Sequence, residues 1–319
     1  MARRLISAQG LGCFVLAVSC ASPGPGTGGD ELPGEALALR FAWPPELSAD
    51  VEVKRLRVRE GEREASSRLI EARYRMRTEP RPDSLRVVSE DLRVTSVDGR
   101  ATSESLGDGK EGADAAIAAL APTLRVDAEG HVLEVEGLEA LRRQTAERLA
   151  QASPQAAAQA ARIAELTITP EALSEHWGAA VESWVGLEVE PGARYDMEVN
   201  DARPGTLEIS ERVACFEGDA DTGCLRLRLE SWLDADEGAA QQQIQSAGRE
   251  LVGQLGGGEL PADAAVSVEV REEIELVTEP ERLVPHFVRV RRERRIEAEH
   301  AGERRSALRI DETEHRYRY

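Results

Sequence analysis

An α+β fold is predicted by this sequence: a large antiparallel sheet, or sheets, of about ten strands, with a central helical segment packed on one face. Three observations predict it. Apolar and polar residues alternate with a period of two over residues 36–98 and again after residue 195. Residues 137–187 instead carry apolar residues at spacings of three and four, which is the pattern of amphipathic helices. The strand-like segments mostly follow one another directly, so antiparallel pairing through hairpins is expected.

Four strands are expected in the first segment. The first two cover residues 36–42 and 51–60, and the fourth covers 85–97, where Asp98-Gly99 is a strong turn signal. In the third strand, apolar residues from Ile70 to Met76 alternate with charged ones. Each strand has a face of mixed Arg and Glu, which we expect to form cross-strand pairs on a solvated surface.

The middle of the chain is predicted to be helical, after two short strands within residues 123–137. Helices are expected over 138–149 and 154–166, and a third begins at Thr169-Pro170, an N-cap followed by a proline at the first helical position. That helix places four large apolar residues on one stripe, which predicts core packing: Leu173, Trp177, Val181 and Trp184.

The last segment returns to strands. They are expected at 195–199, 206–216 and 224–233, then, after a helix over 236–255, at 264–278, 284–299 and 304–319. Residues 36–319 are therefore assigned to an α+β domain. One form that it can take is two β-rich lobes, 36–136 and 195–319, bridged by helices within 137–187.

The first 35 residues have a different character. Arg3 and Arg4 precede an apolar run over residues 5–18, which is long enough for a secretory signal and too short to cross a bilayer. The run ends in Ala17-Val18-Ser19-Cys20, and the following stretch to Glu35 is rich in Gly and Pro, as flexible tethers are. This pattern resembles the lipobox of bacterial lipoproteins, apart from Ala17, where Leu is the usual residue.

The resemblance implies a removed signal peptide (1–19), a lipidated Cys20 and a linker (20–35). It also implies a membrane anchor in the bacterial cell envelope. The outer membrane is favoured because Ala21, and not Asp, follows the cysteine. Cys13 lies in the middle of the apolar run and belongs to the part that would be discarded. The alternative is an ordinary signal peptide with a chance cysteine near its end.

Cys215 and Cys224 are the remaining thiols, and they flank an eight-residue, turn-rich loop between two expected strands. An exported chain meets an oxidising compartment, so we predict a disulfide between them. Strand parity raises one difficulty, because Cys224 alternates with Arg226 and Arg228; a bulge would have to reconcile the two strands. No further His or Cys lies near this pair in sequence, so no metal site is expected there.

Charge and motifs exclude several function classes. The formal net charge is −19, which argues against nucleic-acid binding. No catalytic motif, cofactor motif or zinc-binding histidine pattern occurs. Of the five histidines, His131 is expected to be exposed, His176 has no assigned role, and the last three are expected at solvated strand positions: His286, His300 and His315. A partial calcium-loop match at Asp219, Asp221 and Glu230 lacks the central ligand and the glycine, so no metal is assigned.

Three functions are compatible with these observations. The first is a non-enzymatic envelope lipoprotein that binds a protein or ligand or serves structurally. The second is a carrier of lipid or another hydrophobic ligand, because the order of elements resembles periplasmic lipid- and lipoprotein-carrier half-barrels. Its cavity, between sheet and helices, would be lined by residues such as Ile70, Tyr74, Trp177 and Trp184. The third is a hydrolase without a recognisable signature.

Overall fold

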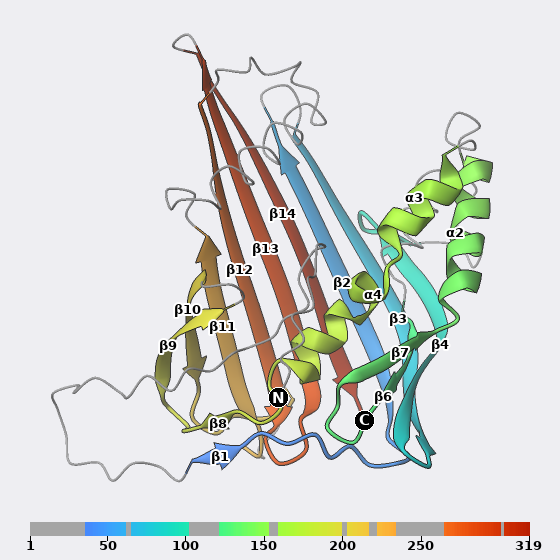
Figure 1. Cartoon of the computed structure of the whole chain (residues 1–319), viewed down its shortest axis with the longest axis vertical. Helices are drawn as coiled ribbons and strands as arrows, with labels where there is room; N and C mark the ends of the chain where they lie inside the picture. Colours follow the sequence, from blue (N-terminus) through green and yellow to red (C-terminus); the bar gives the residue numbers. More distant parts are fainter. Residues whose placement is uncertain are drawn as a thin grey trace, which may run out of the picture.

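The computed structural model describes residues 36–61, 65–101, 121–152, 159–199, 203–216, 222–233, 265–300 and 303–319. Its main feature is a 12-stranded antiparallel sheet in the order β7-β6-β4-β3-β2-β14-β13-β12-β11-β10-β9, with β5 paired to β4 (Figure 1). The strands of this sheet are β2 (Ser48–Glu60), β3 (Ala65–Arg81), β4 (Ser84–Val97), β5 (Arg100–Ala101), β6 (Thr123–Val126), β7 (Val132–Glu136), β9 (Arg194–Val199), β10 (Arg203–Ile209), β11 (Leu225–Leu233), β12 (Ala265–Glu279), β13 (Val284–His300) and β14 (Glu303–Arg318). The predicted α+β class with antiparallel pairing is confirmed, and the sheet has more strands than the ten or so expected.

The middle of the sheet joins the two ends of the chain. β14 lies between β13 and β2, and it pairs with β2 from Leu308↔Glu60 to Arg318↔Asp50. The segments 36–136 and 195–319 are thereby the two halves of one continuous sheet.

The helices gather on one side of this sheet, which we call the inner face (Figure 1). They are α2 (Leu138–Ala152), α3 (Ala160–Thr167), α4 (Pro170–Trp177) and a π-helical turn, η1 (Gly178–Glu182). Thr169 caps α4 as expected, because its Oγ1 accepts a hydrogen bond from the backbone N–H of Ala172 at 3.1 Å. The predicted apolar stripe of Leu173, Trp177, Val181 and Trp184 is buried.

Three buried tryptophans fix the helices and the first extended segment against the sheet. The indole N–H groups of Trp43, Trp177 and Trp184 donate to the carbonyls of Leu283, Gly130 and Ala179 at 2.8, 2.8 and 2.6 Å. Gly130 has φ +89°, and a Cβ built on it would lie 2.8 Å from Cγ of Phe41. The β6–β7 turn therefore requires glycine both for its backbone conformation and for space.

Two expected strands are shorter in the structure. Within residues 36–42 only β1 (Leu37–Ala38) is a strand, and it pairs with β8 (Glu188–Val189) in a separate small sheet. The rest of that segment runs across the end of the main sheet, where the N–H of Leu39 donates to Leu187 and that of Ala42 to Arg282. The strand expected over 206–216 ends at Ile209, and Val213 then forms an isolated bridge to Cys224.

The predicted disulfide is present: Cys215 and Cys224 are joined, with 5.2 Å between their Cα atoms. Cys224 is fully buried although it precedes Leu225, which is buried too. The parity difficulty is resolved because β11 begins only at Leu225, so Cys224 lies in an irregular connection and need not alternate with Arg226.

Some expectations fall outside the described residues, namely the signal peptide, the linker, the helix over 236–255 and the first residues of the helix over 154–166. Among the described helices, none is long and apolar enough to cross a membrane.

Candidate ligand chamber beneath helix α4

A chamber of about 180 Å³ lies between α4 and the inner face of the sheet. β2, β3, β4, β13 and β14 form one wall, and α4 with the start of η1 forms the other. Its lining changes in character along the strands, from aromatic and aliphatic side chains, through two histidines, to charged side chains. The strands extend past α4 (Figure 1).

The apolar end is built on a cluster of rings. Trp43 and Trp177 are packed edge to face with centroids 5.0 Å apart, and Phe41 contacts both at 5.7 and 5.8 Å. Met76 and Leu173 complete this end of the lining, and both are buried. Aromatic rings with satisfied N–H groups present only apolar surface to the chamber.

A stack of polar rings divides the chamber. His176 of α4 lies on His315 of β14, with centroids 3.5 Å apart and planes 15° apart. The Tyr317 hydroxyl and Nε2 of His176 share a hydrogen bond. Burial lowers the pKa of His176 to about 4, and burial together with His176 and Arg55 holds the pKa of His315 well below its usual value. Both rings are therefore neutral at pH 7.

The charged end is formed by Arg55, Arg292, Asp311 and, from α4, Glu175. Nε of Arg292 lies 2.5 Å from Glu272, and the same guanidinium contacts Glu175. Burial lowers the pKa of Arg292 to about 10, and neighbouring Arg294 acts in the same direction. Burial likewise lowers the pKa of Arg55, with Arg57 as the next cause.

Two of the four residues expected to line such a cavity do so. Tyr74 and Trp177 contribute to the chamber, whereas Ile70 and Trp184 are buried without lining it. Trp184 lies two residues beyond the end of η1, where its indole N–H donates to the carbonyl of Ala179, and it is buried in the core.

The prediction of solvated strand histidines was wrong for His286 and His315, which are 6% and 9% exposed. His315 is stacked on His176 of α4, and its charged sequence neighbours Glu314 and Arg316 belong to the opposite face of β14. His286 packs edge to face against Phe216. His131 is exposed, as expected, and is ion-paired with Asp127 at 3.3 Å. The side chain of His300 lies outside the described residues.

Neither of the metal patterns weighed in the sequence gains support. The sulfur atoms of Cys215 and Cys224 lie within 4.8 Å of a His286 ring nitrogen, but they are bonded to each other. Glu230 is on β11 and pairs with Arg228 at 2.6 Å. Asp219 and Asp221 lie outside the described residues.

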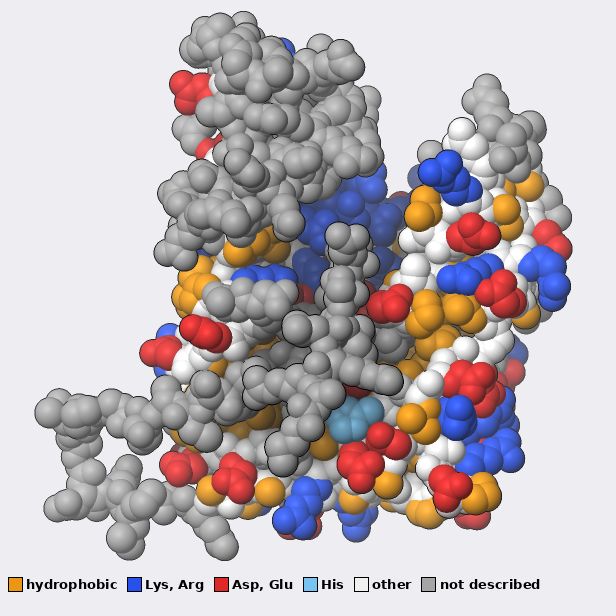
Figure 2. Space-filling model, in the orientation of Figure 1, with side chains coloured by type: hydrophobic (Ala, Val, Ile, Leu, Met, Phe, Trp, Pro, Cys, Tyr) orange, Lys and Arg blue, Asp and Glu red, His pale blue; other side chains and the backbone are white. Residues whose placement is uncertain are grey.

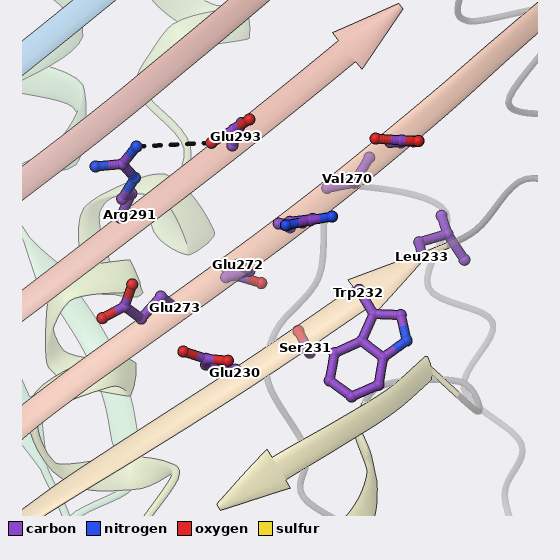
Figure 3. Close-up of a pocket in the computed structure, with 11 residues that line it drawn as sticks. Glu230, Ser231, Trp232, Leu233, Val270, Glu272, Glu273, Arg291 and Glu293 are labelled. Atoms are coloured by element: carbon purple, nitrogen blue, oxygen red, sulfur yellow. Dashed lines mark ion pairs between the residues drawn. The ribbon is translucent and has the colours of Figure 1, made fainter.

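A larger hollow of about 490 Å³ lies along β11, β12 and β13 (Figure 3). Its lining comes from both faces of these strands, since consecutive residues such as Ser231 and Trp232 both contribute. Its charged groups pair along and across strands, as Arg291 does with Glu293 at 3.6 Å. A hollow that wraps the sheet in this way does not enclose a ligand, so we place the candidate site beneath α4.

Comparison with known proteins gives little further information. No family model matches the chain, and no curated protein matches it. Among solved structures the chain is similar to lipovitellin, in a structure described as "Lipid-protein interactions in lipovitellin", with a TM-score of 0.41 and 6% identity. The match covers 87% of this chain and 25% of that chain, so this chain spans about a quarter of its length. We draw no argument about function from a likeness at this level.

Proposed function

We propose that this protein is a non-enzymatic carrier or binder of a hydrophobic ligand, which it holds in the chamber beneath α4. The chamber itself is the observation that carries the proposal. Native cores contain few voids larger than a water molecule, whereas an apolar cavity of about 150 Å³ is enough to bind benzene. A chamber of about 180 Å³ lined by Trp43, Met76 and Trp177 has the size and lining for a ring or a short stretch of alkyl chain.

A polar group in the chamber supports the same proposal. Nδ1 of His315 is buried and has no hydrogen-bond partner among the described residues. Ligand pockets combine apolar walls with a few polar atoms that orient the ligand, and a neutral histidine can donate or accept. A purely structural role gives no reason for either feature, and the carrier hypothesis accounts for both.

Binding of the neutral fluorescent probe N-phenyl-1-naphthylamine tests the proposal. Thr313 of β14 lines the chamber and is half-buried, so Thr313→Phe would fill it, whereas Thr313→Val keeps the shape. We expect saturable binding to the wild type and to Thr313→Val, and at least tenfold weaker binding to Thr313→Phe. Thermal unfolding of all three proteins shows whether Thr313→Phe still folds. No saturable binding to the wild type, or equal binding to a folded Thr313→Phe protein, would contradict the proposal.

We also propose that the domain is held in the bacterial cell envelope, at the outer membrane, by lipid on Cys20. The supporting pattern is the apolar run ending in Ala17-Val18-Ser19-Cys20 and the Gly- and Pro-rich stretch after it. Two acyl chains give stable membrane attachment where one does not. Metabolic labelling with an alkyne analogue of palmitate should mark the wild type and Cys13→Ser but leave Cys20→Ser unmarked. Labelling of Cys20→Ser, or of none of the three, would refute the anchor.

A further inference from the structure

Arginines lie side by side on neighbouring strands of the inner face, just beyond the chamber. Residues that pair across a ladder share a face, and Arg59, Arg309 and Arg294 lie directly opposite one another on β2, β14 and β13. The next row toward the chamber runs across five strands. It consists of Arg68, Arg57, Asp311, Arg292 and Glu272. We call these two rows, together with Arg55 below them, the arginine rows; they hold seven arginines and two carboxylates.

The opposite, outer face of the same strands is arranged differently. One outer row alternates in charge over eight strands from β3 to β9: Glu71, Lys54, Glu314, Arg289, Glu275, Arg228, Glu208 and Arg194. Opposite charges facing each other across strands stabilise a sheet, and like charges facing each other destabilise it. Among the described residues, this outer row therefore balances four acidic and four basic side chains, whereas the arginine rows hold seven arginines beside two carboxylates, with Glu175 of α4 as a further acid on Arg292.

Two of these arginines, Arg55 and Arg292, lie where a positive charge is costly. Arg57 and Arg309 share Asp311 at 2.9 and 2.6 Å, so one carboxylate serves two guanidinium groups. Burial and neighbouring arginines lower the pKa values of Arg55 and Arg292, which means that both groups lose hydration and are repelled by like charge. A bound anion would offset the repulsion and accept hydrogen bonds in place of the lost water.

The arginine rows are continuous with the chamber. Arg55 and Arg292 belong both to the arginine rows and to the lining of the chamber. Arg55 pairs with Thr313, and the next residue on the same face of β2 is the apolar Val53. Figure 2 shows a broad Lys and Arg surface in the hollow beside α2 and α3. A single molecule with an apolar part and an anionic part can therefore contact both regions.

We propose that the arginine rows bind the anionic headgroup of an amphiphile, a phosphate or a carboxylate, whose apolar part enters the chamber beneath α4. This inference rests on the proposed function and specifies its ligand class. Guanidinium groups form paired, charge-assisted hydrogen bonds to the oxygens of phosphates and carboxylates. A row of such groups can bind headgroups of different size.

A displacement assay with bound N-phenyl-1-naphthylamine tests the headgroup assignment. The competitors are decyl phosphate, decyl maltoside and inorganic phosphate, with both decyl compounds kept below micelle-forming concentrations. We expect decyl phosphate to displace the probe at a concentration at least tenfold lower than decyl maltoside. Inorganic phosphate should neither displace the probe nor raise the melting temperature. Equal displacement by the two decyl compounds would overturn the headgroup assignment, and a melting temperature raised as much by inorganic phosphate as by decyl phosphate would assign the rows to a free anion.

A matched pair of double variants locates the effect. Arg59→Gln with Arg294→Gln removes two charges from the arginine rows, and Arg228→Gln with Arg289→Gln removes two from the outer face. The variant of the arginine rows should bind decyl phosphate about tenfold or more weakly and bind the probe within twofold of the wild type. The outer-face variant should change neither affinity. An equal effect of both pairs would overturn the proposal, because it would then depend on net charge alone. Failure of the probe to bind the wild type at all would instead refute the proposed function.

Discussion

Acidification should destabilise this protein through the stacked pair His176 and His315. The pKa of His176 is about 4 in the folded protein, and its ordinary value of 6.5 applies in the unfolded chain. Between these values the unfolded state binds more protons than the folded state, so stability is fully present above pH 6.5 and is lost as the pH falls toward 4.

The size of the effect follows from the same two pKa values. Between pH 7 and pH 5, one histidine with this shift removes about 2 kcal/mol from the free energy of unfolding. His176 is half-buried rather than enclosed, so about 2 kcal/mol is the largest loss of unfolding free energy expected from that residue. His315 is more deeply buried and acts in the same direction.

Urea unfolding at pH 7, 6 and 5 measures the loss, and His176→Gln with His315→Phe serves as the variant that cannot titrate. The glutamine can still hydrogen-bond Tyr317, and the phenylalanine retains a ring in the stack. We expect the wild type to lose about 2 kcal/mol more than the variant between pH 7 and 5. His131→Gln, at an exposed position, should follow the wild type. Parallel losses in the wild type and the double variant would refute the reasoning.

Two further perturbations test the fold. Gly130→Ala forces a side chain onto a φ of +89° and against Phe41, so it should cost roughly 1–3 kcal/mol and change the near-ultraviolet circular dichroism of the tryptophans, whereas Gly99→Ala, where no atom lies within 4 Å, should cost less. Replacing Cys215 and Cys224 by Ser should lower the free energy of unfolding by roughly 2.5–3 kcal/mol, as expected for a short loop, and reductant should then have no further effect on the variant. Equal costs at the two glycines, or a reductant-sensitive double-serine variant, would contradict these expectations.

Local pattern was enough to predict the long strands and the central helices of this fold. Alternation at period two located the long strands, and the stripe from Leu173 to Trp184 identified a buried helical segment whose residues are now seen in the core. The order of strands was not accessible, because nothing local distinguishes β2 and β14 as neighbours. That pairing brings together residues about 260 positions apart and determines which side chains meet at the chamber.

The arginine rows were missed, although the sequence contains their signal. In β2 the apolar residues change phase: Val51 and Val53 occupy one parity, and Leu56 and Val58 the other. A phase change means that the face that is apolar at one end of the strand becomes charged further along, at Arg55. Treating the charges as one solvated face concealed this. His315 was misassigned for a related reason, since its charged sequence neighbours, Glu314 and Arg316, lie on the opposite face of the strand.

The position of β14 has a consequence for how this chain is assembled. β14 follows all the other described strands in sequence but pairs at the centre of the sheet, so β2 keeps an open edge until β14 has been synthesised. Because β14 is a central strand, its loss would separate the sheet into two halves, each with an unpaired strand edge prone to association. We therefore expect the edge of β2 to need shielding until β14 has been made.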